Sequence, residues 1–240
     1  MRRLIRADLR RILSKPGFYI CPVILFALFI YGLFTDPIEY DSYYASLDLQ
    51  LSFVYPFFVL LPVFTCVYGD ELRSGTMIPA IGRGLSRTKV ILAKFIDTLI
   101  LSLAFCLFFL LMDQITFDRF SVVLTKVQTL RVFSAYAAAW LQILGFCAFA
   151  AIFVYLTWNS SVGLVVGLIS ISFSKMILDW LQSHTHLPFY DITLMGQADQ
   201  ARRQFDAGNI WVHHLLFVLL WYALFLTVSA LIFNRKELEL

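Results

Sequence analysis

Six long apolar segments occupy most of this 240-residue chain. They cover residues 18–34, 51–69, 90–112, 132–158, 161–181 and 210–233. At a helical rise of about 1.5 Å per residue, even the shortest covers about 25 Å, close to the roughly 30 Å of a bilayer's hydrocarbon core. Only 15% of the residues are charged, whereas a soluble domain carries about 25%. Because backbone groups in lipid must bond within their own segment, we predict an all-α membrane protein with six transmembrane helices.

The charged residues between these spans predict the orientation of the chain. Six spans place both termini on one side, where the connecting segments carry 13 Arg and Lys against 5 Asp and Glu; the segments on the other side carry 5 against 10. The first set comprises residues 1–17, 70–94 and 234–240, and the second 35–50, 113–131 and 179–209. Basic residues concentrate on cytoplasmic segments. We therefore expect a multi-pass protein of the cell (plasma) membrane with both termini cytoplasmic. The net charge of +3 is then an orientation signal and requires no nucleic-acid partner.

The N-terminal stretch MRRLIRADLRRILSKPG has the pattern of an amphipathic helix. Its leucines and isoleucines recur at helical spacing, and arginines occupy the other flank. We predict an interfacial helix over residues 1–17, before Pro16 and Gly17 turn the chain into the first span. This helix is a membrane anchor, an elbow that also touches a cytoplasmic partner, or both. Residues 234–240 form a short cytoplasmic tail.

Several polar residues fall inside the predicted spans. Lys175 precedes Asp179 by four residues, so the two side chains can face each other on one flank of a helix. Lys175 is then either a snorkelling cation paired near the headgroups, or a residue at the outer mouth of a path that meets an acidic group on a ligand. Lys94 and Asp97 form a similar pair at the inner end of the third span.

The four cysteines also lie within spans. Cys21, Cys66, Cys106 and Cys147 show neither the clustering of a metal motif nor a disulfide framework. We expect buried free thiols.

The segment GDELRSGTMIPAIGRGLSRTKVILAK separates the second and third spans and is the longest internal segment expected in the cytoplasm. Its pattern E-x-R-S-G-T, followed by mixed residues and S-R-x-K, resembles the first cytoplasmic loop of ABC type-2 export permeases. The matching residues are Glu71, Arg73, Ser74, Gly75, Thr76, Ser86, Arg87, Lys89 and Lys94. The family's usual Pro before the S-R pair is replaced here by Gly82-Arg83-Gly84, with Pro79 earlier.

The resemblance implies a cytoplasmic coupling helix within residues 70–89, which docks on a separate ABC ATP-binding subunit. Docking would involve Glu71, Arg73, Ser74, Gly75, Thr76, Arg83 and Arg87. No cofactor is expected on this chain, since ATP and Mg²⁺ would bind the partner subunit. A second permease subunit, identical or paralogous, would complete the path.

The same resemblance places a translocation path between the second and fifth spans. The candidate path residues are Phe53, Tyr55, Phe57, Phe58, Phe173 and Lys175. Such an aromatic wall suits a hydrophobic or amphipathic substrate: an antimicrobial or surfactant-like peptide, a lipid or a drug. Residues 182–209 would form an outer gate of short re-entrant helices.

Enzymatic motifs are absent from the sequence. It contains no G-x-x-x-x-G-K-[ST], H-E-x-x-H or G-x-S-x-G, so we expect no catalysis on this chain. Two alternatives stay open: a non-transporting membrane sensor or assembly protein that docks a cytoplasmic partner, and an intramembrane protease. The protease would use Ser170 or Ser172 with His213 or His214. These histidines, with His184 and His186, could also bind Zn²⁺ or sense pH, although we predict no metal site.

Overall fold

The computed structural model describes residues 2–34, 47, 50–69, 72, 81–82, 84–120, 123–185, 188–207 and 212–235. All regular structure in these residues is helical, as predicted. The long helices are α1 (Arg2–Leu13), α2 (Pro16–Leu33), α7 (Arg87–Arg119), α8 (Lys126–Thr157), α9 (Ser160–Thr185), α11 (Leu194–Asp206) and α12 (Val212–Arg235). A single turn, α10 (Phe189–Ile192), precedes α11.

The second apolar segment is helical from Gln50 to Gly69 but not uniformly so. Its centre is the α-helix α4 (Tyr55–Pro62), and wider π-helical turns, Gln50–Val54 and Val63–Gly69, flank it. Pro62 has no backbone N–H to donate, which interrupts regular α-helical bonding where the second set of π turns begins.

Four helices in the described part of the chain are long and apolar enough to cross a membrane: α7, α8, α9 and α12. Helices α1 and α2 meet at a bend of 62° and count together as a fifth span at most. The stretch Tyr55–Gly69 is a shorter apolar helix. The protein thus has four to five candidate spans, and the count of six stays a prediction.

Local sequence signals define the ends of the central helices. The Ser86 side chain accepts a hydrogen bond from the Lys89 amide and caps α7, and Thr125 forms a capping box with Gln128 at the start of α8. Helix α8 ends at Trp158, which adopts a left-handed conformation with φ 56°. The tight turn that follows makes α8 and α9 antiparallel neighbours.

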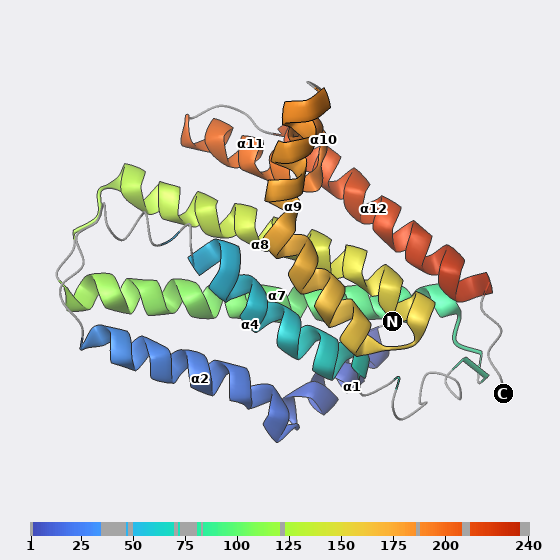
Figure 1. Cartoon of the computed structure of the whole chain (residues 1–240). Helices are drawn as coiled ribbons and strands as arrows, with labels where there is room; N and C mark the ends of the chain where they lie inside the picture. The colour runs from blue at the N-terminus through green and yellow to red at the C-terminus, as the bar shows by residue number, and fades with distance from the viewer. Residues whose placement is uncertain are drawn as a thin grey trace.

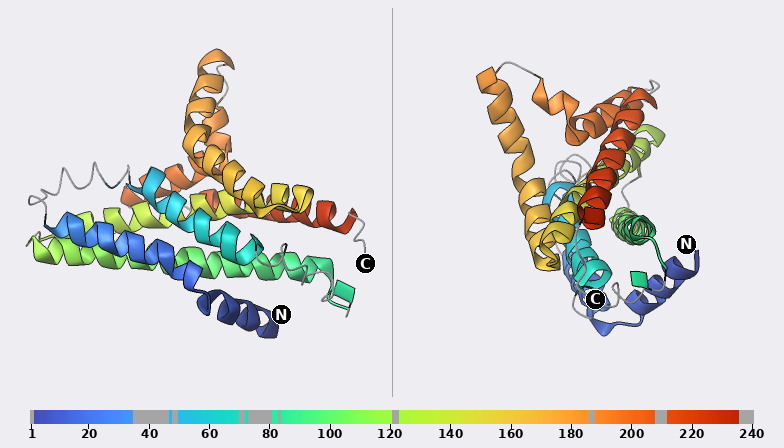
Figure 2. Two further views of the ribbon diagram at one scale, coloured as in Figure 1. Left: turned by 60° about the horizontal axis from the view of Figure 1, so that its bottom comes forward. Right: turned by 90° about the vertical axis from the view of Figure 1, so that its right-hand side faces the viewer.

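Helix α8 is the centre of the molecule, in contact with α7, α9, α11 and α12 (Figure 1). The first residues of α1 and the last turn of α12 lie at the end of the bundle where α7 begins. We call this the terminal end and the opposite one the distal end. Figure 2 shows that the second half of α9 leaves the bundle and projects from it. Accordingly, the buried residues of α9 all lie in its first eight positions: Ser160, Gly163 and Gly167.

The interior contains large aromatic side chains whose polar atoms are hydrogen-bonded. Tyr55 donates to the Ser102 carbonyl over 3.1 Å, and the Trp140 indole donates to the Ser102 hydroxyl over 3.0 Å. The Tyr136 hydroxyl donates to the buried carboxylate of Asp113. The four cysteines are free and buried, which confirms the prediction for them.

Candidate functional site

A cavity of about 510 Å³ separates the second apolar segment from α9. Helix α8 forms its floor and the first turn of α11 closes one side. Its walls include Leu51 and Pro56 of the second segment, Gln142 and Phe146 of α8, Ser172, Lys175 and Asp179 of α9, and Met195 of α11. The second and fifth predicted spans therefore meet around a hollow with both polar and apolar walls.

Lys175 and Asp179 provide the charges of this cavity. Both side chains are exposed within the chain, and their spacing of one helical turn places them on the same wall. Lys175 lies about 22 Å along α9 from its first residue, beyond the middle of a 30 Å hydrocarbon layer. A cation and a carboxylate among apolar side chains can orient a ligand that carries both an ionic group and a hydrophobic body.

A second cavity of about 360 Å³ lies on the other side of α9. Its walls are almost wholly apolar and include Phe149, Ile177, Trp221 and Phe225. Phe146 and Met195 line both cavities. The two cavities are therefore neighbours, and these two apolar side chains form part of the wall of each.

The α10–α11 segment, within the predicted gate of residues 182–209, packs deep in the bundle. Leu194 contacts Gly145 of α8 so closely that a Cβ on Gly145 would lie 2.3 Å from a Leu194 methyl. Gly145 is about 18 Å along α8 from its last residue, so α11 begins within the apolar layer and rises toward the distal end. This is the geometry of a re-entrant segment, which is tolerated where its backbone is buried in protein.

Hydrogen bonds hold this segment in place. Gln142 donates to the Asp199 carboxylate over 2.8 Å, and Tyr190 donates to the same carboxylate. Burial and the bond to Asp199 raise the pKa of Tyr190 above that of a free phenol, which is itself protonated at neutral pH. Trp221 of α12 donates to the Ile192 carbonyl over 3.1 Å. The α10–α11 segment is thus tied to α8 and α12.

The four described aromatic side chains that were predicted for the path, Tyr55, Phe57, Phe58 and Phe173, do not line this cavity. Tyr55 and Phe58 are buried in the core, while Phe57 is 43% and Phe173 47% exposed. The Phe53 side chain is outside the described residues. Of the predicted path residues whose side chains are described, Lys175 alone lies on the wall of the 510 Å³ cavity.

Sequence reasoning missed Gln142 and Asp199. Gln142 lines this cavity and donates to Asp199. Ser172, which the sequence suggested only as a protease candidate, also lines the cavity. Gln142 could have been found, because it is a polar residue within an otherwise apolar span.

Arg87 was predicted to contact a partner subunit, and in this chain it caps α12. Its guanidinium donates to the carbonyls of Phe233 and Asn234 over 2.8 and 3.0 Å and lies 5.8 Å from the centre of the Phe233 ring. A cation at a helix C-terminus binds the unpaired carbonyls and opposes the negative end of the helix dipole. The other docking candidates, Glu71, the run 73–76 and Arg83, lie outside the described residues.

A buried charge cluster lies next to Arg87 along α7. The Lys94 ammonium lies 2.8 Å from the Asp8 carboxylate of α1 and 3.9 Å from Asp97. Asp8 also pairs with Arg11 at 3.8 Å. The predicted Lys94–Asp97 pair is present, but Asp8 was missed; its signal was a single acid in a basic amphipathic segment.

Two of the described histidines form hydrogen bonds within the chain, and the Nδ1 atom of His184 lies 3.2 Å from the Ser183 hydroxyl. His214 shares a hydrogen bond of 2.7 Å with Gln197, and its ring contacts that of His213. His184 packs on Trp180 and its Nδ1 lies 2.9 Å from the Trp180 carbonyl. In the described part of the chain, no group of three or more His, Cys, Asp or Glu side chains is placed to hold a metal ion.

The fold and the apolar composition define a helical membrane protein with several candidate spans. A family model described as protein of unknown function (DUF2705) matches residues 18–238, and the chain belongs to that family. A search of curated proteins finds no match.

Proposed function

We propose that the chain is the transmembrane permease subunit of an ATP-driven ABC exporter. It would have six spans in the cell membrane and cytoplasmic termini. It would pair with a second permease subunit, identical or paralogous, and with ATP-binding subunits that carry ATP and Mg²⁺. The substrate would be hydrophobic or amphipathic, such as an antimicrobial or surfactant-like peptide, a lipid or a drug.

The observation that carries this proposal is how the segment 70–89 is anchored at both ends. At its start, Gly69 packs on the first residue of α9, where a Cβ would lie 2.9 Å from the Ser160 hydroxyl. At its end, Arg87 holds the last turn of α12. A force on the segment would therefore act directly on α9, α7 and α12.

The buried ion pair extends this linkage to the N-terminal helix. Lys94 lies two turns beyond Arg87 on α7 and holds Asp8 of α1. Tightly packed elements transmit displacements as rigid bodies. A docked ATPase that pulls on residues 70–89 would move α1 together with α7, and this fits the elbow role expected for residues 1–17.

The cavity at Lys175 supports the transport half of the proposal. Relative movement of α9 and the second segment would widen or close the hollow between them, and Lys175 would meet an acidic group on the substrate. Because α9 is anchored near Gly69 at its start and mostly exposed over its second half, it is the element best placed to move.

Co-purification with an ATPase tests the docking half. The chain is expressed with the ABC ATPase encoded nearest to it, and the double variant Glu71→Ala/Arg73→Ala is compared with wild type. The matched control, Asp118→Ala/Arg203→Ala, removes one acid and one base from exposed positions at the distal end. We expect the docking variant to lose the ATPase and the control to keep it.

Two outcomes contradict parts of this proposal. Full ATPase occupancy on the docking variant would remove Glu71 and Arg73 as contacts. An ATPase complex that moves no peptide, lipid or drug in proteoliposomes would favour the sensor or assembly alternative.

A further inference from the structure

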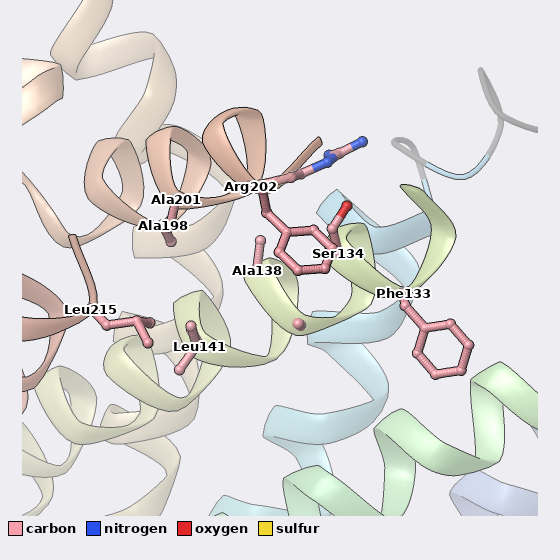
Figure 3. A pocket seen from close by; sticks show the side chains of 10 residues that line it. Phe133, Ser134, Ala138, Leu141, Ala198, Ala201, Arg202 and Leu215 are labelled. Atoms are coloured by element: carbon pink, nitrogen blue, oxygen red, sulfur yellow. The ribbon is translucent and has the colours of Figure 1, made fainter. Parts of the chain in front are cut away.

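A third cavity, of about 260 Å³, lies between α8, α11 and α12 (Figure 3). None of its described lining residues belongs to the two cavities beside α9. Alanines on facing turns of α8 and α11, among them Ala138 and Ala201, leave the space open. An apolar cavity of about 150 Å³ already holds a benzene molecule, so this one has room for a longer stretch of hydrocarbon.

The polar lining residues of this cavity lie toward one of its ends along the bundle axis. Among the described residues that line it, all are apolar except Arg202 and Ser134. In Figure 3, Leu141 and Leu215 lie toward one end, whereas Arg202 and Ser134 lie toward the other. The charged end is the distal one, since Ser134 is nearer than Leu141 to the start of α8.

Its depth matches one leaflet of a bilayer. The α8 residues that line it, from Leu141 to Phe133, lie about 24 to 36 Å along the helix from its last residue. This range is the distal part of the predicted span 132–158. A hydrocarbon occupant at this depth is surrounded by acyl chains, and its polar end reaches the headgroup layer.

The charge at the rim favours an anionic headgroup. Arg202 lines the cavity itself, and Arg131 is one turn before Ser134 on the same face of α8, toward the distal end. The segments predicted on the distal side, residues 35–50, 113–131 and 179–209, contain five basic residues. One of them, Arg202, lines this cavity, and Arg131 is one turn from the lining residue Ser134. Guanidinium groups bind phosphate with directed, charge-assisted hydrogen bonds.

We propose that this cavity is a binding site for one anionic glycerophospholipid of the distal leaflet. One acyl chain would fill the space between Ala138 and Ala201, and Arg202 would hold the phosphate. The bound lipid would act as a wedge that supports α11 against α8. This site does not depend on the proposed transport function.

Lipid retention by the purified full-length chain tests the site. Delipidated protein in detergent is titrated with phosphatidylglycerol or with phosphatidylcholine of the same acyl chains, and bound lipids are counted by native mass spectrometry. We expect one high-affinity phosphatidylglycerol per chain. Arg202→Gln should weaken it about tenfold, the effect of one charge-assisted hydrogen bond of 1.5 kcal/mol or slightly less. Arg203→Gln, on an exposed neighbour that does not line the cavity, should leave it unchanged.

A filling variant tests the acyl chain separately from the charge. Ala201→Leu should reduce retention of both lipids, and Ala138→Val provides a smaller filling from the opposite wall if the first variant folds poorly. Equal retention of the two lipids by wild type would overturn the proposal. So would a phosphatidylglycerol preference that survives Arg202→Gln, or unchanged retention in both filling variants.

Discussion

The Asp8–Lys94 ion pair should contribute more to stability than any other polar contact between α1 and α7. The side chains of Lys94 and Asp8 are only 2% and 9% exposed, and their charged atoms are 2.8 Å apart. Removal of one partner from a buried ion pair costs about 3–5 kcal/mol, because the remaining charge stays in a poorly solvating environment. Lys94→Met should fall at the upper end of this range, since it removes a cation that also lies 3.9 Å from Asp97. Asp8→Asn should fall at the lower end, because Lys94 then keeps Asp97.

These costs translate into measurable shifts in melting temperature. For chains of about 150–250 residues, 1 kcal/mol corresponds to about 2–4 °C, so Lys94→Met should lower the melting temperature by about 10 °C or more. The four buried free cysteines permit the measurement with a thiol-reactive fluorophore, whose signal rises as the helices separate. Lys89→Met is the matched control: it removes an exposed lysine from the first turn of α7 and should change stability by less than about 0.5 kcal/mol.

The double variant Asp8→Asn/Lys94→Met completes the comparison. Because the two residues are in contact, their combined cost should fall short of the sum by about 0.5–3 kcal/mol. The reasoning is refuted if Lys94→Met has the same melting temperature as the Lys89→Met control. It is also refuted if the stability costs of Asp8→Asn and Lys94→Met are simply additive in the double variant. Either result would mean that solvent reaches the pair and screens it.

Three further changes have expected outcomes that the structure specifies. Arg87→Gln should loosen the end of α12 and make a cysteine introduced at Ser229, which is buried in the wild type, label faster. Arg87→Lys should keep only part of the protection, because a lysine lacks the planar fork that serves two carbonyls; equal labelling with Arg, Gln and Lys at position 87 would contradict this. Gly196→Ala should lower the melting temperature, because its Cβ would lie 2.0 Å from the Tyr190 carbonyl oxygen, while Gly17→Ala, with nothing within 4 Å, should not. In the reconstituted ATPase complex, Lys175→Gln should abolish stimulation by ligands that carry an acidic group and preserve stimulation by neutral ones; the loss of both would assign Lys175 a structural role.

The helical class and the positions of the main helices could be predicted from the sequence. A capping hydrogen bond joins residues only a few positions apart in the sequence. The starts of α7 and α8 could therefore be predicted from Ser86 and Thr125. The second apolar segment was harder to predict, since hydropathy does not distinguish α-helical from π-helical turns. Its prolines were visible, but the structure was needed to show where regular bonding fails.

The composition of the site could not be predicted in the same way. The resemblance to export permeases suggested that Tyr55 and Phe58 line a path, yet both pack in the core, because a large side chain in lipid gains as much from neighbouring helices as from a cavity. Gln142 and Met195 became wall residues only when α11 folded back between α8 and α12.

The sequence by itself determined that this chain is a set of helices with a basic N-terminal helix, because hydrogen bonds within a helix and apolar length are local properties. Only the tertiary structure decided which charges meet. Lys94 finds Asp8 from 86 positions away, and Arg87 finds the end of α12 from 146 positions away. Such contacts depend on how the helices cross, and the packing of many apolar side chains sets those crossings together.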